Sequence, residues 1–324
     1  MTTSEELIAK NGFVDIPLEP TLDPKEEIEW LKKEKNALIL AHFYQKSEVQ
    51  DIADFVGDSL ELTSFIGSTD AELIIFGGVY FMAETAKILY PDRRIILPDL
   101  TAGCSLADSC PSEQFKEFVK AHPGHVVISY INCSAKIKAL SDIVCTSSNA
   151  LKVINSIPRD LPILFAPDRN LGRYIAMITG REMTLWPGHC EVHASFDPEK
   201  IKALQQRYPF AELIAHPESE PDILKISSFV GSTSQLIKYV EKSTNKEFIV
   251  ATEAGVLHEM KKKAPYKKIL AAPVNDQKRG ECENMKKISL EKVFRALRYE
   301  KPEVTVDAIL RQQAIKPIRR MFDL

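Results

Sequence analysis

The stretch Leu38-Ile-Leu-Ala-His42-Phe-Tyr44 is the first of three related segments in this chain. The second is Val126-Val-Ile-Ser-Tyr130-Ile-Asn132, and the third is Leu213-Ile-Ala-His216-Pro-Glu218. Each segment is an apolar run that ends in two polar residues separated by one other residue. A pattern that recurs along a chain indicates one supersecondary unit used several times.

The repeats stay in register beyond these segments. A hydroxyl-bearing residue follows the first polar residue of each segment after 17 positions: Ser59, Ser147 and Thr233. A cysteine follows after a further 45, 43 and 49 positions: Cys104, Cys190 and Cys282. We therefore expect three equivalent units whose matching residues face a common centre.

The composition is that of an ordinary globular protein. The 324 residues are 44% hydrophobic and 27% charged, and this length allows two or three domains. The net charge of −3 implies no bulk attraction to nucleic acid. No apolar run approaches the roughly 18 residues that span a bilayer, and the N-terminus lacks a secretory segment. We expect a cytoplasmic protein with no nucleic-acid or membrane partner, whose six cysteines stay reduced.

Four short strands separated by helices are expected in each repeat. Short apolar runs without alternation are typical of strands covered on both faces, and the intervening stretches have helical spacing. This pattern predicts an α/β protein of three pseudo-threefold-related αβα domains, each with a short four-stranded parallel sheet. The expected strands are 37–41, 54–56, 73–76 and 94–97, then 126–129, 142–144, 163–165 and 183–185, then 213–215, 228–230, 248–250 and 268–270.

The repeats define the expected domain boundaries. An N-terminal extension covers 1–36, with a short charged helix over 24–35. A basic C-terminal tail covers 300–324. The repeats between them are 36–123 with Cys104, 124–209 with Cys190, and 210–299 with Cys282.

The hydroxyl-bearing residues each open an expected helix at the carboxyl end of a strand, where open α/β sheets bind ligands. Serine and threonine are favoured helix N-caps even without a ligand, so capping is the simpler interpretation for any one of them. Three converging helix N-termini would also attract an anion, because each offers free N–H groups and about half a positive charge. The expected ligand is a small polyanion that carries carboxylate or phosphate groups.

The polar residues that follow the first strand of each repeat can perform acid–base chemistry. Histidine and glutamate can transfer protons, a phenol can relay one, and an amide can orient a substrate. For any single residue a satisfied loop position is the simpler interpretation, whereas equivalence across three repeats favours a site. The set is His42, Tyr44, Tyr130, Asn132, His216 and Glu218. His189 and His193 flank Cys190 and could be ligands, partners of ligands or loop residues.

The six cysteines fall into two groups. Cys110, Cys133 and Cys145 have no equivalents in the other repeats and fit buried thiols. Cys104, Cys190 and Cys282 occupy matching loops, and three thiolates on one axis would make a metal site. Structural zinc usually requires four ligands. Three thiolates on a four-iron cluster would leave one iron open as a Lewis acid.

With these residues in place, the chain from Ala37 to Leu297 resembles the quinolinate synthase (NadA) family. The resemblance implies three pseudo-symmetric α/β domains, each giving one cysteine to a [4Fe–4S] cluster with an iron that no protein group binds. It also implies condensation of iminoaspartate with dihydroxyacetone phosphate to quinolinate, phosphate and two waters, in NAD biosynthesis. The motifs that carry it are Ala41-His42-Phe-Tyr44, Val56-Gly-Asp-Ser59-Leu, Tyr130-Ile-Asn132, Cys145-Thr-Ser147-Ser-Asn, Trp186-Pro-Gly-His-Cys190, Ala215-His216-Pro-Glu218, Val230-Gly-Ser-Thr233 and Cys282-Glu-Asn-Met-Lys286.

The resemblance also implies roles for individual residues. Cys104, Cys190 and Cys282 would bind the cluster. The residues that would contact substrate are His42, Ser59, Tyr130, Asn132, Ser147, His216, Glu218 and Thr233. The residues expected to be catalytic are Tyr44, Glu218, His42, Tyr130 and His193, with Tyr44 and Glu218 favoured for proton transfer. Some bacterial members carry a second cysteine beside the last ligand, but Gly280-Glu281-Cys282 has none, so a cysteine-pair redox switch is not expected at that loop.

Other functions remain open at this stage. The chain could be another [4Fe–4S]-dependent hydro-lyase of small carboxylic acids. It could be an iron–sulfur electron carrier or sensor without chemistry of its own, or a binding module held together by zinc. Functional coupling to an L-aspartate-oxidising enzyme, which would supply the unstable imine, is a further open point.

Overall fold

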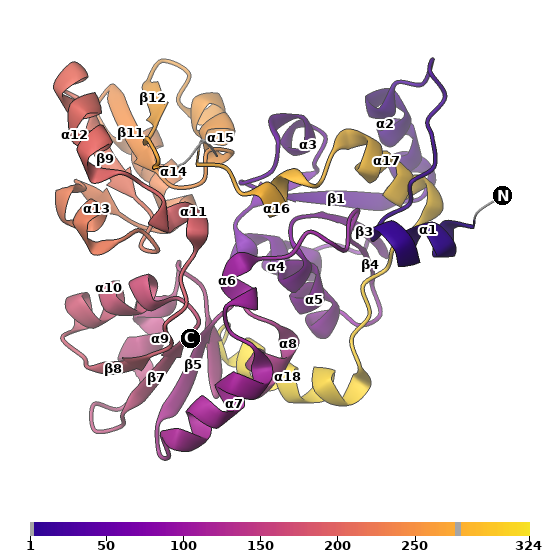
Figure 1. Cartoon of the computed structure of the whole chain (residues 1–324). Coiled ribbons are helices and arrows are strands. Elements are labelled where there is room, and N and C mark those ends of the chain that lie inside the picture. The colour runs from indigo at the N-terminus through magenta and orange to yellow at the C-terminus, as the bar shows by residue number, and fades with distance from the viewer. Residues whose placement is uncertain (1–2, 276–279) are drawn as a thin grey trace. The chain divides into compact units, whose positions relative to one another are not determined.

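The computed structural model describes residues 3–275 and 280–324 (Figure 1). The undescribed residues 1–2 and 276–279 belong to the expected N-terminal extension and third repeat. The chain forms two compact units. Unit 1 comprises Met1–Cys104 and Glu283–Arg311, and unit 2 comprises Ser105–Cys282 and Gln312–Leu324.

Unit 1 contains one four-stranded parallel sheet with the strand order β2-β1-β3-β4. Its strands are β1 (Ala37–His42), β2 (Phe55–Gly57), β3 (Leu73–Gly77) and β4 (Arg94–Ile96). The helices α2 (Pro24–Glu34) and α17 (Leu290–Tyr299) pack against each other and against β1 and β3. The helices α4 (Ser59–Gly67) and α5 (Tyr80–Leu89) cover the other face (Figure 1). The remaining helices are α1 (Ser4–Asn11), α3 (Ser47–Asp51) and α16 (Glu283–Lys286).

Unit 2 contains two further sheets with the same topology, β6-β5-β7-β8 and β10-β9-β11-β12, and all their strand pairs are parallel. The strands of the first are β5 (Val126–Tyr130), β6 (Ile143–Cys145), β7 (Ile163–Ala166) and β8 (Met183–Leu185). Those of the second are β9 (Glu212–Ala215), β10 (Phe229–Val230), β11 (Glu247–Ala251) and β12 (Lys268–Ala271). The predicted α/β class with three four-stranded parallel sheets is therefore confirmed, whereas the residue boundaries between the repeats stay a prediction.

The sheets of unit 2 are flanked by pairs of helices. One sheet packs with α9 (Ala150–Ser156) and α10 (Arg169–Thr179), and with α7 (Ser112–Ala121) and α8 (Ala135–Ala139). The other packs with α14 (Thr233–Lys242) and α15 (Val256–Lys263), and with α12 (Pro198–Arg207) and α13 (Pro221–Ile226). Two short helices, α6 (Ser105–Asp108) and α11 (Glu191–Ala194), complete this part of the chain.

The expected C-terminal tail contains a helix, α18 (Ala308–Arg320), that buries Ala314, Pro317 and Ile318. In unit 2, the Arg320 guanidinium donates to the carbonyl oxygen of Asp142 at 2.8 Å. The tail therefore packs through an apolar stripe and is not only a charged extension.

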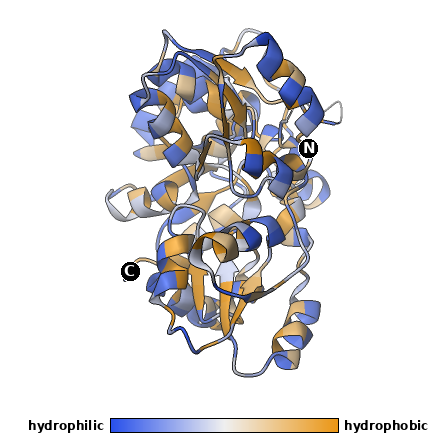
Figure 2. Ribbon diagram, turned by 90° about the vertical axis from the view of Figure 1, so that its left-hand side faces the viewer, coloured by the Kyte–Doolittle hydropathy of each residue, from blue (hydrophilic) through white to orange (hydrophobic). Residues whose placement is uncertain are grey.

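The strands form the core because they are apolar on both faces. All five residues of β3 are buried, as parallel sheets covered by helices require. Phe76, Phe165 and Phe248 on β3, β7 and β11 are among the largest fully buried side chains. Figure 2 shows the same pattern, with hydrophobic strands and hydrophilic outer helix faces. Within residues 3–275 and 280–324, no helix combines the length and apolar character needed to cross a bilayer.

Replacing Phe165 with alanine should lower the free energy of unfolding by about 3–5 kcal/mol, because a large side chain would leave a cavity in close-packed surroundings. Urea unfolding followed by circular dichroism measures this loss. Phe210→Ala is the control: Phe210 is 79% exposed, and its removal should change stability by no more than about 0.5 kcal/mol. Equal losses in the two variants would contradict the assigned core.

Candidate metal and acid–base site

The strand order places the expected site residues at one edge of each sheet. In every sheet the first and third strands of the repeat are parallel neighbours, and the direction in which strands are added to the sheet switches between them. Ligands bind at such switch points, beyond the carboxyl ends of the strands. His42 ends β1, Tyr130 ends β5, and His216 directly follows β9. The predicted positions of these three residues at the ends of the first strands are therefore confirmed.

The interpretation of Ser59 and Thr233 as helix N-caps is wrong by one residue. Asp58 caps α4 and Ser232 caps α14, each in a capping box with the residue three positions later. Ser59 and Thr233 are instead the first residues of their helices, and Ser147 lies three residues before α9 begins. Aspartate and serine are both strong N-caps, so the earlier residue satisfies the amides of the first turn.

Glu218 is the centre of a buried polar cluster in unit 2. The Tyr130 hydroxyl donates to Oε1 of Glu218 at 2.5 Å, and Nδ1 of His193 lies 3.1 Å from Oε2. Nδ1 of His216 lies 3.8 Å from Oε1. These four residues come from the end of β5, from α11 and from the loop after β9, and all are buried. The structure therefore brings Tyr130, His216, Glu218 and His193 together, and their shared role stays a prediction.

The surroundings of Glu218 keep its carboxylate ionised. Burial alone would raise the pKa of Glu218, but the two histidines and the Tyr130 hydroxyl outweigh burial and hold it below its ordinary value. Asp168 shows the opposite shift. Burial, together with the negative charge of Glu218, raises the pKa of Asp168 well above its ordinary value. Glu218 is therefore held ionised, whereas burial and the Glu218 charge oppose the ionisation of Asp168, which the N–H groups of Leu171 and Cys190 favour.

His193 connects this cluster to a cysteine. Its Nδ1 lies 3.2 Å from Sγ of Cys190, and its Nε2 lies 2.9 Å from Oγ1 of Thr252. The ligand atoms of Cys190, His193 and Glu218 all lie within 4.8 Å of one another, a spacing that could hold a metal ion. The sequence did not single out Thr252, although its place just past β11, beside β9 in the sheet, was a usable signal.

The cysteines divide by burial as the repeat pattern predicts. Cys110, Cys133 and Cys145 are buried, and burial strongly raises the pKa of the Cys110 and Cys145 thiols. These thiols are therefore protonated and are poor metal ligands. Cys104, Cys190 and Cys282 are only half-buried, and each directly precedes a four-residue helix. Cys104 belongs to unit 1 and the other two to unit 2, so the expected gathering of all three stays a prediction.

The corresponding loop of unit 1 carries His42 and Tyr44. The rings of these residues meet edge to face with centroids 4.5 Å apart. Nδ1 of His42 accepts a hydrogen bond from the backbone N–H of Tyr44 at 3.1 Å. The Lys286 ammonium donates to the carbonyl oxygen of Tyr44 at 2.6 Å and so anchors the loop. Lys286 ends the motif Cys282-Glu-Asn-Met-Lys286, and no role was predicted for it.

The same backbone contact recurs in the third repeat, where Glu218 N–H donates to Nδ1 of His216 at 3.4 Å. An N–H that points at Nδ1 requires that nitrogen to be the acceptor. In the neutral ring the proton then lies on Nε2. His42 and His216 are thus both set to donate from Nε2, as an oxygen-rich substrate would require.

Asn132 has one unsatisfied atom. Its Oδ1 is buried and has no hydrogen-bond partner among the residues that the structure describes. Buried polar atoms in native proteins are nearly always paired, so this oxygen is suited to accept a hydrogen bond from a bound molecule. Contact between Asn132 and substrate stays a prediction.

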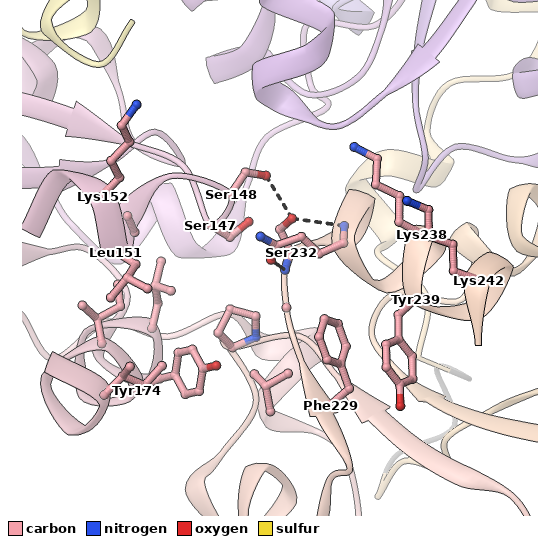
Figure 3. Close-up of a pocket in the computed structure, with 18 of the residues that line it drawn as sticks. Ser147, Ser148, Leu151, Lys152, Tyr174, Phe229, Ser232, Lys238, Tyr239 and Lys242 are labelled. Atoms are coloured by element: carbon pink, nitrogen blue, oxygen red, sulfur yellow. Dashed lines mark hydrogen bonds between the residues drawn. The ribbon is translucent and has the colours of Figure 1, made fainter. Parts of the chain in front are cut away.

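Unit 2 also contains a cavity of about 1160 Å³, lined by residues of α9, α10 and α14. Lys152, Lys238 and Lys242 are part of its lining, together with the hydroxyls of Ser147 and Ser148 (Figure 3). The Ser148 hydroxyl donates to that of Ser232 at 2.9 Å. Ser147 is one of the residues expected to bind an anion. The three lysines add positive charge to the lining of the same cavity.

The chain is similar to a family of known proteins over most of its length. A family model described as "Quinolinate synthetase A protein" matches residues 26–323. The quinolinate synthase of Rippkaea orientalis is 54% identical over 295 residues, which cover 91% of each chain. That of Nostoc punctiforme is 54% identical over 304 residues, 94% of each chain, and that of Cyanophora paradoxa is 54% identical over 299 residues, 92% of this chain and 91% of the relative.

Tyr130→Phe should lower the free energy of unfolding of the metal-free protein by about 1.5–3 kcal/mol at pH 7, because it removes a buried hydrogen bond to a charged carboxylate. The folded-state pKa of Glu218 lies below its unfolded value, so its ionic contacts stabilise the fold above the unfolded pKa of about 4.3. That contribution disappears as pH falls through the folded pKa. The loss in Tyr130→Phe should therefore shrink on acidification.

Urea titrations at pH 7 and at progressively lower pH measure this difference. Tyr239→Phe is a matched control, since the Tyr239 hydroxyl donates to Glu212 at 2.8 Å near the surface and should contribute no more than about 1 kcal/mol. A loss in Tyr130→Phe that does not change with pH would count against an ionised Glu218.

Proposed function

The chain belongs to the quinolinate synthase (NadA) family, and from this premise we propose that it condenses iminoaspartate with dihydroxyacetone phosphate to quinolinate, phosphate and two waters. Its activity is that of a quinolinate synthase, in the biosynthesis of NAD. The observation that carries the finer proposal is the group of half-buried Cys190 with buried His193 and Glu218, which joins a thiol to an ionised carboxylate through one imidazole.

We propose that Cys104, Cys190 and Cys282 hold a [4Fe–4S] cluster. The support is chemical: these are the three half-buried cysteines, whereas the other three are buried, Cys110 and Cys133 in an apolar cluster. Thiolates are the usual ligands of such clusters, and a set of three leaves one iron without a protein ligand. When bound, the cluster would supply a Lewis acid that assists the loss of water from substrate.

Proton transfer is assigned to groups that the chain itself provides. Glu218 is ionised, buried and 2.5 Å from the Tyr130 hydroxyl, so it can receive a proton through that phenol. His193 holds the opposite carboxylate oxygen in place, and Thr252 fixes the far side of its ring. Tyr44 is the proposed second proton carrier, because Lys286 and His42 hold its loop from two sides in unit 1.

Substrate binding is assigned to the remaining polar residues. His42 and His216 would donate from Nε2 to carboxylate or phosphate oxygens, and Asn132 would accept a hydrogen bond through its buried Oδ1. Ser59 and Thr233 are the first residues of α4 and α14, and their hydroxyls would donate to a bound anion. Ser147 joins them from the loop before α9. Both proposed substrates are anions, which agrees with this set of donors.

The proposed setting is the cytoplasm, with small-molecule substrates as the partners. Functional coupling to an L-aspartate-oxidising enzyme stays part of the proposal, because the imine is unstable in water. One alternative has a specific observation in its favour: the sulfur, nitrogen and oxygen atoms of Cys190, His193 and Glu218 could together hold a single zinc ion. Metal analysis distinguishes a zinc ion from an iron–sulfur cluster.

Cys190→Ser should abolish the iron–sulfur cluster, since a hydroxyl is a poor replacement for a thiolate ligand. Iron and acid-labile sulfide in anaerobically purified protein provide the measurement, with about four irons per chain expected in the unmodified protein. Cys145→Ser is the matched control, because Cys145 is fully buried and should leave the metal content unchanged. Colourless protein that contains zinc would refute the cluster.

Tyr44→Phe and Glu218→Gln should keep the cluster but lower turnover by about 10²–10⁴-fold, the usual contribution of a positioned acid or base. Anaerobic assays of quinolinate formation, with iron content as a check, measure the effect. Tyr266→Phe is the control, since Tyr266 is 94% exposed and should retain full rate. Turnover equal to that of the control would remove the tested residue from the mechanism.

A further inference from the structure

Two buried carboxylates bind the backbones of the cysteine loops in unit 2. Oδ2 of Asp168 accepts a hydrogen bond from the N–H of Cys190 at 3.1 Å. Oε1 of Glu253 accepts one from the N–H of Cys282 at 2.9 Å. Asp168 has no exposed surface and Glu253 is 1% exposed. Each acid therefore reaches a cysteine loop that is distant from it in the sequence.

The two acids occupy equivalent positions in their repeats. Each lies two residues past the end of the third strand, β7 or β11. In both repeats the residue after the acid donates its N–H to the glycine two positions before the cysteine. Arg169 donates to Gly188 at 2.8 Å, and Ala254 donates to Gly280 at 3.0 Å. In each repeat the hydrogen bond to the carboxylate therefore supplements a backbone hydrogen bond between the segment after the strand and the cysteine loop.

The first repeat shows that this backbone contact does not need an acid. Tyr80 N–H donates to the carbonyl oxygen of Ala102, two positions before Cys104, at 2.7 Å. The residue at the position of the acid is Val79, which is 2% exposed. Because an apolar residue is sufficient there, and because burying a carboxylate is costly, the acids of the other two repeats require a separate explanation.

Both oxygens of each carboxylate are used. Oδ1 of Asp168 accepts from the N–H of Leu171 at 2.7 Å, and Oε2 of Glu253 accepts from the N–H of Gly255 at 2.7 Å. One oxygen of Asp168 therefore caps α10, and one oxygen of Glu253 holds the turn before α15, while the other oxygen of each acid holds the cysteine loop. A side-chain amide cannot replace this arrangement, because it has one acceptor oxygen and its NH₂ group would face a second N–H donor.

We propose that Asp168 and Glu253 are positioning residues that fix the backbone of the Cys190 and Cys282 loops for the metal cofactor, whereas the equivalent position in the first repeat is Val79. The proposal deepens the proposed function and rests on it, because Cys190 and Cys282 are the proposed cluster ligands. Its distinctive consequence is that an isosteric change from acid to amide loosens one specific cysteine loop without removing any ligand.

The test compares Asp168→Asn and Glu253→Gln with Asp197→Asn in the full-length protein. Asp197 also caps a helix, but both backbone N–H groups that it accepts from, those of Glu199 and Lys200, bind Oδ1, which asparagine retains. Its Oδ2 has only a surface ion pair with the Lys200 ammonium at 3.6 Å. Amide hydrogen exchange of the metal-free protein is expected to be about tenfold or more faster at Cys190 in Asp168→Asn, and at Cys282 in Glu253→Gln. Each variant should leave the other cysteine amide unchanged.

A second readout uses the anaerobic holoprotein. Transfer of iron to an external chelator should be faster in both acid-to-amide variants than in Asp197→Asn, without a change in the number of ligands. The proposal is overturned if amide hydrogen exchange and iron release in Asp168→Asn and Glu253→Gln are no faster than in Asp197→Asn. If Asp168→Asn does not fold, Glu253→Gln tests the same idea in the other loop. An unmodified protein without an iron–sulfur cluster would refute the proposed cofactor, while amide exchange would still decide whether the carboxylates hold the loops.

Discussion

The pairing of the first and third strands in each repeat is the constraint on which the candidate site depends. Parallel pairing of β5 with β7, and of β9 with β11, places the carboxyl ends of neighbouring strands side by side. Residues that follow these strands then meet although they are far apart in the sequence. Tyr130, Asp168, His216 and Thr252 all occupy such positions. The same order in the sheet of unit 1 places the His42 loop beside the end of β3.

The buried charge of Glu218 organises the chemistry at that edge. An ionised carboxylate in the interior is tolerated only when donors and positive charge surround it. Tyr130 supplies a hydroxyl, and two histidines provide the balancing interactions. The same charge disfavours ionisation of the nearby Asp168. The arrangement keeps an ionised base beside a thiol and concentrates several titratable groups in a small volume, as acid–base sites commonly do.

Burial also explains why six cysteines divide into two classes. Cys110 and Cys133 pack with Phe115 and Trp186 in an apolar cluster, where a thiolate would be poorly solvated. Cys190 and Cys282 lie in half-buried loops, and their backbones are bound by carboxylates that leave the sulfur atoms to other partners. The distinction is therefore one of solvation and of backbone support, and not of cysteine number or spacing alone.

The sequence by itself determined the three repeats, the strand positions to within one or two residues, and the separation of Cys104, Cys190 and Cys282 from the other cysteines. These features are periodic, and a recurring local pattern is visible in one dimension. Only the tertiary structure identified Thr252 and Lys286 as supports of site residues, and Asp58 and Ser232 as the true helix caps.

Asp168 and Glu253 show why the sequence could not reveal everything. They are different residue types, and they lie 22 and 29 residues from the cysteines that they hold, so no common motif joins them. Their equivalence follows from position relative to a strand end, which strand pairing sets in three dimensions. Long-range hydrogen bonds of this kind depend on which strands become neighbours, and only the folded sheet decides that.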